Sequence, residues 1–101
     1  MSANLPKAER RAAILDAAVN LAKRKNYTTL TATDVSNAAG CAKGLVFHYF
    51  KNMRGLRVEI LRKAVAAGHL TIIAHGLVAD DPVIRQISKE TKNAALASLT
   101  P

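Results

Sequence analysis

The sequence predicts an all-α fold, and three observations support this prediction. Half of the 101 residues are hydrophobic, so the chain is able to bury a core of modest size. Alanine, leucine, lysine and arginine dominate, whereas alternation of Val, Ile and Thr is rare. Apolar residues recur at three- and four-residue spacing, which is typical of amphipathic helices. The length suits one compact domain.

The first helix is expected from Lys7 to Lys25, after a short arm that ends at Pro6. Proline suits a helix start because its missing N–H would have no partner there. The expected apolar stripe consists of Ile14, Leu15, Ala18, Leu21 and Ala22. The basic residues 23–25 fall in the last turn, where the helix dipole favours cations, and Asn26 is expected to be a left-handed stop.

Two short helices joined by a glycine turn are expected between residues 31 and 50. Thr31 is a good N-cap, and Asp34 follows three residues later, near the positive end of the helix dipole. Gly40 is expected to end the first of these helices, and the second should run from residue 42 or 43 to residue 50. The residues expected to face inward on the first helix are Val35, Ala38 and Ala39.

Further helices are expected after residue 50. Asn52 is the N-cap candidate of a longer helix that ends near Gly68. Residues 69–79 are mostly apolar and predict a short buried helix. The acidic pair before Pro82 marks the start of a last helix that should reach about Ser98. The expected apolar side of that helix consists of Val83, Ile84, Ile87, Ala94, Ala95 and Leu99.

The charge distribution favours a polyanionic partner. The formal net charge is +8, and residues 1–79 carry all of this excess, since residues 80–101 hold three charges of each sign. A cationic field of this size attracts polyanions, of which nucleic acid is the commonest. A membrane surface and an acidic protein are the alternatives. The two helices joined by a glycine turn favour DNA, because such a pair can place one helix in the major groove.

Other classes of function lack support in the sequence. The single cysteine, Cys41, cannot form an internal disulfide, and with three scattered histidines it gives no zinc spacing. We therefore expect no metal and no cofactor, and we interpret Cys41 as a small buried apolar residue. The sequence contains neither a nucleophile–base pair nor a phosphate-binding loop, the patterns that would indicate an enzyme. No apolar stretch suits a signal core or a membrane span, so we expect a cytoplasmic location, at the nucleoid through DNA binding.

Nearly half of the chain resembles the N-terminal DNA-binding domain of TetR-family transcriptional regulators. The resemblance covers residues 11–56 without a gap, and the order of its pieces is more specific than a lone turn glycine. It is carried by Ile14–Ala18, Leu30-Thr31, Val35, Ala38–Gly40, Lys43–Asn52 and Leu56. The resemblance implies a three-helix domain containing a helix-turn-helix at 31–50, followed by a long fourth helix and one or two short helices.

The resemblance also implies which residues meet DNA. Thr33, Lys43, Gly44 and Leu45 align with positions that approach bases or phosphates, and Phe47 aligns with an aromatic residue that lies against the DNA backbone. His48 and Tyr49 occupy positions that reach DNA as well. The full set expected at DNA is Thr31, Thr33, Ala42, Lys43, Gly44, Leu45, Phe47, His48, Tyr49, Lys51 and Arg54.

Three departures from the family pattern reduce the expected phosphate contacts. Phe47 stands where Tyr is usual, Met53 stands where Lys is usual, and Ala42 replaces a Ser or Thr cap. Each loss weakens contact with the DNA backbone, which supplies much of the affinity. Three nearby basic residues are candidates to compensate, namely Lys51, Arg54 and Arg57.

The sequence therefore predicts a DNA-binding transcriptional regulator, as a dimeric repressor of a palindromic operator. We assign residues 1–56 to DNA binding and residues 57–101 to core completion and homodimerisation. The short second part leaves little room for a pocket, so a small-molecule effector is not expected. Compact mobile elements often use small repressors of this kind, so we expect a plasmid or phage origin. The alternatives are a DNA-organising or segregation protein with the same unit, and a protein-interaction module that has lost DNA binding.

Overall fold

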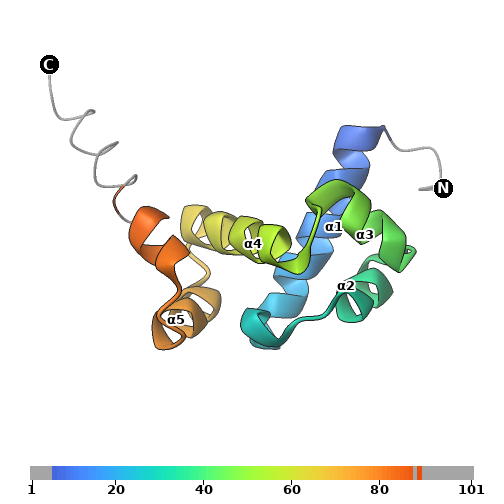
Figure 1. Ribbon diagram of the computed structural model, residues 1–101. Helices are drawn as coiled ribbons and strands as arrows, with labels where there is room; N and C mark the ends of the chain where they lie inside the picture. The colour runs from blue at the N-terminus through green and yellow to red at the C-terminus, as the bar shows by residue number, and fades with distance from the viewer. Residues whose placement is uncertain (1–5, 88, 90–101) are drawn as a thin grey trace, which may run out of the picture.

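The computed structural model describes residues 6–87 and 89, and every regular element within them is helical (Figure 1). The predicted all-α fold is confirmed. The helices are α1 (Lys7–Ala22), the 3₁₀ turn η2 (Tyr27–Thr29), α2 (Ala32–Ala39), α3 (Lys43–Phe50), α4 (Met53–Ala67) and α5 (Leu70–Val78). Residues 82–87 are helical too. The expected arm before Pro6, and the expected continuation of the last helix through Ala94, Ala95 and Leu99 to Ser98, lie outside the described residues.

The connection from α1 to α2 corrects two expectations. Helix α1 ends at Ala22, so the basic residues 23–25 follow the helix and do not form its last turn. Asn26 does not end α1 in a left-handed conformation, since its φ is −57° and ψ is 121°. Its side-chain oxygen instead accepts a hydrogen bond of 3.0 Å from the Thr28 N–H and caps η2. An asparagine suits both roles, and here the N-cap role prevails because η2 begins directly after it.

The ends of α2 and the start of α4 follow the predicted cap signals. Thr31 and Asp34 form a complete capping box, and Gly40 ends α2 with a φ of 67°. Asn52 accepts a hydrogen bond of 2.8 Å from the Gly55 N–H and starts α4, which ends at the left-handed Gly68. These five polar and glycine positions satisfy or release the backbone groups that every helix end leaves unpaired.

The inward face of α2 is rotated from the one expected. Val35 is buried and Ala39 is half-buried, but Ala38 is exposed. Ser36 is buried in its place, and its hydroxyl donates a hydrogen bond of 3.0 Å to the Thr33 carbonyl. This local bond satisfies the hydroxyl, so a serine is tolerated at a buried position of α2.

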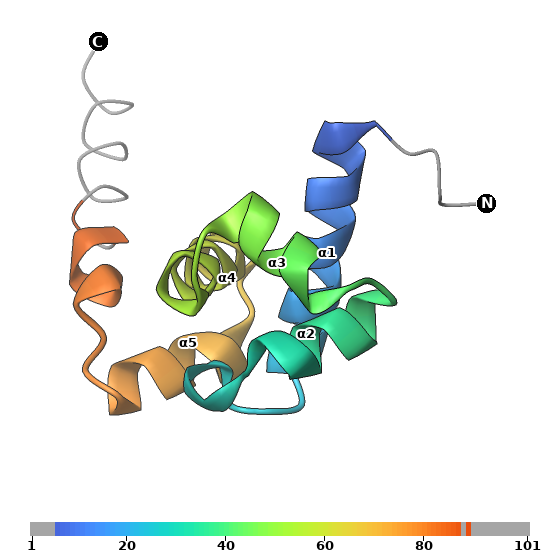
Figure 2. The same cartoon turned by 45° about the vertical axis from the view of Figure 1, so that its right-hand side comes forward.

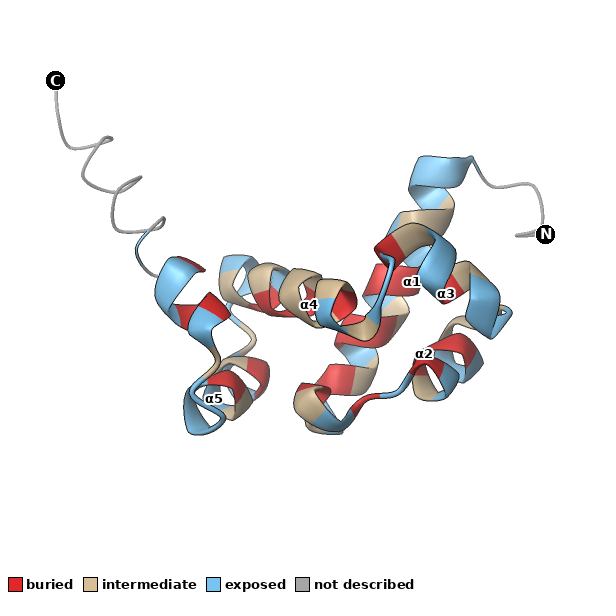
Figure 3. Cartoon of the chain, in the orientation of Figure 1, coloured by how far each residue is buried: buried red, intermediate tan, exposed pale blue. Residues whose placement is uncertain are grey.

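The hydrophobic core forms around α4, which contacts α1, α3 and α5 (Figure 1). Figure 2 shows α2 packed beside α1, while α3 packs against α2 and α4, and Figure 3 shows the buried residues lining the space among the helices. One cluster of buried side chains joins all of these elements. Its members include Ile14 and Ala18 from α1, Val46 and Phe50 from α3, and Leu56, Ile60, Leu61 and Ala64 from α4.

Helix α5 is less buried than its composition predicts. Only Ile72 and Gly76 are buried, whereas Leu70, Leu77 and Val78 are 77%, 61% and 87% exposed. The expectation of a buried helix is therefore wrong for one side of α5, because α4, η2 and Ile84 pack against its other side.

The start of the last helix is confirmed. The Asp81 Oδ1 atom accepts a hydrogen bond of 3.0 Å from the Val83 N–H, one residue after Pro82. The buried apolar residues of this segment are Val83, Ile84 and Ile87, as expected.

Candidate nucleic-acid interface

Helix α3 uses one side for the core and leaves the other open. Val46 and Phe50 are its buried residues. The remaining predicted contact residues from position 42 to 49 are exposed or half-buried, which Figure 3 shows along the outer side of α3. The exposed ones are Ala42, Lys43, Gly44, Phe47 (37% exposed) and His48, and the half-buried ones are Leu45 and Tyr49. An eight-residue helix with this open side has the size and exposure of a helix that enters a major groove.

The start of α3 is open to a close approach. Ala42 is its N-cap and supplies no side-chain hydrogen bond, so the first N–H groups of the helix keep their donors available. A Cβ added at Gly44 would meet nothing within 4 Å, which shows open space at that position. Backbone donors and a missing side chain at a helix N-terminus suit contact with a phosphate oxygen.

The start of α2 presents two exposed threonines. The Thr31 hydroxyl oxygen accepts a hydrogen bond of 3.1 Å from the Asp34 N–H, and its own proton stays free to donate. The Asp34 carboxylate accepts from the Thr31 N–H at 3.0 Å and from Lys25 Nζ at 3.1 Å. These bonds, the one from the Thr31 backbone above all, lower the pKa of Asp34. The carboxylate is thus engaged by its neighbours beside the exposed Thr33.

The end of α3 makes a sharp turn toward α4. Lys51 has a φ of 66°, which is unusual for a residue with a side chain, and its N–H donates a 2.8 Å hydrogen bond to the Phe47 carbonyl. His48 and Tyr49 pack edge to face with ring centroids 5.0 Å apart. The turn therefore leaves the Lys51 side chain exposed close to the two rings that the sequence placed at DNA.

The cations at the start of α3, in the turn after it and in the first turn of α4 have no protein partners among the described residues. Lys43, Lys51 and Arg54 are exposed, and within residues 6–87 and 89 none of their side chains forms an ion pair or hydrogen bond. Elsewhere cations are engaged, as in the pair between Lys63 Nζ and Asp16 at 3.0 Å. Unpaired cations gathered near an exposed helix are what a phosphate backbone requires.

Arg11 holds α3 in place rather than pointing to a ligand. Its guanidinium carbon lies 4.5 Å from the centroid of the Phe50 ring, and its Nη2 atom pairs with the Glu59 carboxylate. The contact joins α1, the last residue of α3 and α4. Arg11 thus serves to position the helix that carries the candidate interface.

Arg57 and Tyr27 have structural roles that the sequence did not predict. Arg57, expected near phosphates, is half-buried, and its Nη2 atom donates a hydrogen bond of 3.0 Å to the Leu30 carbonyl, one residue before α2. Tyr27 is fully buried, and its hydroxyl donates a hydrogen bond of 2.8 Å to Asp81. Both bonds link residues far apart in the chain, so no local pattern signals them. Cys41 is half-buried against the core, close to its expected role.

The described residues contain neither a candidate metal site nor a candidate membrane span. No group of three or more His, Cys, Asp or Glu side chains in that part of the chain is placed to hold a metal ion. None of the helices described there combines the length and the apolar character that a bilayer span demands.

A comparison with protein families identifies the domain that contains this interface. Residues 14–60 match the family model described as "Bacterial regulatory proteins, tetR family". No curated protein and no solved structure gave a significant match. The matched range contains η2, α2, α3 and the start of α4, together with most of α1. Residues 14–60 are thus a helix-turn-helix DNA-binding domain of the TetR family, the domain of a transcriptional regulator.

Proposed function

We propose that the protein is a repressor that binds a palindromic operator as a homodimer, with α3 in the major groove. The observation that carries the proposal is the exposed side of α3, flanked by Lys43, Lys51 and Arg54, which have no partners among the described residues. Occupying a promoter requires no chemistry, so a protein without catalytic machinery can repress. A two-fold protein reads two half-sites and doubles the contact with DNA.

The residues divide into base and phosphate contacts. We assign base contacts to Lys43, Leu45 and His48, since Lys reads guanine and apolar groups read the thymine methyl. We assign backbone contacts to the start of α2, the start of α3 and the turn after α3, where donors and cations are exposed. The backbone set consists of Thr31, Thr33, Ala42, Gly44, Phe47, Tyr49, Lys51 and Arg54.

The decisive experiment selects bound sequences from a random DNA pool and then measures the affinity for the selected site. Lys43→Ala should weaken specific binding about 5- to 150-fold, or relax the preference at one base pair, as expected for loss of a base contact. Lys23→Ala, which removes an exposed lysine beyond the end of α1, is the matched control and should have little effect. Unchanged affinity and unchanged base preference in Lys43→Ala would contradict our placement of α3.

The exposed side of α5 is our candidate for the dimer interface. At 100° per residue, Leu70, Ala74, Leu77 and Val78 fall on the side opposite the buried Ile72 and Gly76. Helix α5 has no Lys, Arg, Asp or Glu, so two copies of a chain with a net charge of +8 can meet here without charge repulsion. In Figure 1, α5 lies on the other side of α4 from α3, which leaves both recognition helices free.

A charge placed on this side of α5 tests the dimer. Leu77→Glu should lower the mass measured by sedimentation equilibrium from dimer to monomer, and should weaken binding to a full palindrome far more than binding to a half-site. Ala13→Glu adds the same charge on an exposed position of α1 and should leave the dimer intact. A monomeric wild-type protein, or a dimer that survives Leu77→Glu, would exclude this interface.

A reporter assay and a genome-wide binding profile separate repression from the two other readings. Repression predicts occupancy confined to one or a few promoters and increased transcription when the gene is removed. A DNA-organising protein predicts many dispersed or clustered sites without a transcriptional effect. A protein-interaction module predicts no DNA binding even at low salt. We expect the protein at the nucleoid in the cytoplasm.

We propose that no drug-sized effector controls binding. Ligand pockets of that kind hold about 300–1,000 Å³. The depression between α1 and α2 has about 560 Å³, but it is an open part of the surface that does not enclose a ligand. The two cavities that flank the start of the last helix hold about 180 Å³ and 80 Å³. The smaller of them is lined by α5 and the segment that follows it, and neither has the volume for a large organic ligand.

A further inference from the structure

A single carboxylate lies at the start of the helix-turn-helix. Asp34 is the one acidic residue of the sequence between residues 31 and 50. It completes the capping box with Thr31, and both Thr31 and Thr33 beside it are exposed. The two threonines belong to the proposed backbone contacts, so a DNA phosphate at the start of α2 would meet this negative charge. Repulsion between the carboxylate and the phosphate opposes binding unless a cation neutralises the carboxylate.

Lys25 supplies such a cation from the residues that follow α1. Its Nζ atom lies 3.1 Å from Asp34 Oδ2, and the same oxygen accepts a hydrogen bond of 3.0 Å from the Thr31 N–H. Because both bonds end on one oxygen atom, the ammonium group is held beside the N-cap of α2. The ion pair therefore places a positive charge at the point where the proposed interface has its acidic residue.

The backbone of Lys25 is fixed on both sides. Its N–H donates a hydrogen bond of 2.9 Å to the Leu21 carbonyl in the last turn of α1. Asn26, the next residue, is the N-cap of η2 and accepts a hydrogen bond from the Thr28 N–H. The Lys25 side chain therefore reaches Asp34 from a rigid segment, so only the side chain has to be ordered when the ammonium group takes one position.

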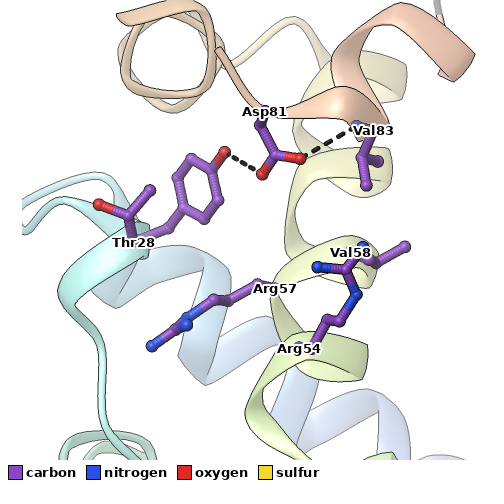
Figure 4. A pocket seen from close by; sticks show the side chains of 7 residues that line it. Thr28, Arg54, Arg57, Val58, Asp81 and Val83 are labelled. Atoms are coloured by element: carbon purple, nitrogen blue, oxygen red, sulfur yellow. Dashed lines mark hydrogen bonds between the residues drawn. The ribbon is translucent and has the colours of Figure 1, made fainter. Parts of the chain in front are cut away.

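Arg57 approaches the same segment from α4 but has a different role. Figure 4 shows its side chain turned away from Asp81, and its Nη2 atom donates a hydrogen bond of 3.0 Å to the Leu30 carbonyl. Arg57 is half-buried and bound to the backbone, so it fixes the segment before α2. The Lys25 side chain, in contrast, is 47% exposed, and its bond to Asp34 uses one of the three N–H donors of the ammonium group. Of these two cations, Lys25 is the one that is open to a ligand.

We propose that Lys25 is a further residue of the DNA interface, which neutralises Asp34 and donates to a phosphate oxygen at the start of α2. The inference rests on the proposed function, because it requires the start of α2 to face the DNA backbone. Asp34 is then a positioning residue that holds the ammonium group in place. Fold stability does not account for the ion pair, since an exposed pair contributes little and the capping box needs only Thr31 and Asp34.

The test measures the affinity of the full chain for the selected site and for unrelated DNA over a range of salt concentrations. Lys25→Gln should weaken both about tenfold at low salt, through loss of the contact and exposure of the Asp34 charge to the phosphate. It should lower the slope of log affinity against log salt by about one and leave the base preference unchanged. Lys23→Gln removes the same charge from an exposed lysine whose Nζ atom lies 3.4 Å from Asn20 Oδ1, and it should keep the wild-type slope. Equal urea midpoints in the two variants would exclude unfolding as the cause.

Asp34→Asn tests the positioning role, because its amide oxygen can still accept from the Thr31 N–H while the charge is removed. In this background Lys25→Gln should weaken binding only about threefold, since no carboxylate is left without a cation. Equal losses in both backgrounds, or a salt slope that Lys25→Gln leaves unchanged, would overturn the proposal. If the wild type binds DNA and Lys25→Gln behaves as Lys23→Gln does, this inference fails while the proposed function stands. A wild-type protein that binds no DNA would overturn both.

Discussion

The Tyr27–Asp81 hydrogen bond allows a quantitative prediction, because it is buried at one end and charged at the other. The Tyr27 ring is fully buried, its hydroxyl lies 2.8 Å from Asp81 Oδ2, and Asp81 itself is half-buried. Tyr27→Phe keeps the ring and removes the hydroxyl, so no large cavity forms. A hydrogen bond to a charged group contributes about 1.5–3 kcal/mol. Water reaches Asp81 in part, so we expect a loss of about 1.5 kcal/mol in the free energy of unfolding.

This contribution should disappear at alkaline pH. Burial of the Tyr27 hydroxyl, and secondarily its bond to Asp81, raise the pKa of Tyr27 above the ordinary value of 10.0. Above that value the unfolded chain releases the proton and the folded chain keeps it, so the free energy of unfolding falls with pH. The slope is about 1.4 kcal/mol per pH unit for one group. The stability difference between the wild type and Tyr27→Phe should thus shrink from about 1.5 kcal/mol near pH 8 to almost zero near pH 11.

The assay is urea unfolding of both proteins followed by far-ultraviolet circular dichroism at the two pH values. Lysines and the other tyrosine titrate in both proteins, so the difference isolates Tyr27. Tyr49→Phe is the control near neutral pH, where we expect less than about 0.5 kcal/mol, since the Tyr49 hydroxyl has no hydrogen bond in the described part of the chain. A difference that stays constant from pH 8 to pH 11 would refute the reasoning, because Tyr27 would then titrate alike in both states.

Three further changes test the packing around the domain. Thr31→Ala should cost about 1 kcal/mol through loss of the capping box, whereas Thr33→Ala on the same helix should cost under about 0.5 kcal/mol, as urea unfolding would show. Gly76→Ala places a Cβ 3.0 Å from the Tyr27 hydroxyl and 3.0 Å from Ile84 Cδ1, so it should destabilise the wild type by about 1 kcal/mol and Tyr27→Phe by less, because only the Ile84 contact remains there; equal effects in both backgrounds would contradict the contact with the hydroxyl. Arg11→Met should lower the melting temperature through about 1 kcal/mol of lost pairing with Phe50, and an unchanged melting temperature would show that this pairing contributes nothing.

Local signals predicted the helix-turn-helix well. The capping box at Thr31, the left-handed Gly40 and the Asn52 cap are each formed by residues within a few positions of one another. Such features depend on backbone chemistry that the sequence states directly. The start of the last helix before Pro82 was predictable for the same reason. The family resemblance covered the same region, and the match at residues 14–60 confirmed it.

Features that depend on partners distant in the chain could not be predicted from the sequence. The apolar composition of α5 indicated burial but not which side other helices cover, and Leu70 and Val78 proved exposed. Asn26 suits two roles, and only the path of the chain after α1 decides between them. The bond between Tyr27 and Asp81 joins residues 54 positions apart, so no periodicity reports it.

The segment before α2 is where the second part of the chain acts on the DNA-binding part. Helices α4 and α5 both contact η2, Arg57 holds the Leu30 carbonyl, and Tyr27 is bonded to Asp81. Leu30 is followed directly by Thr31, the N-cap of α2. Loosening η2 should therefore free the start of α2 before it frees α3. Tyr27→Phe should speed amide hydrogen exchange at Asp34 more than at Phe47, because local opening follows the contacts that hold each segment. Equal acceleration at both sites would mean that the domain opens as one unit.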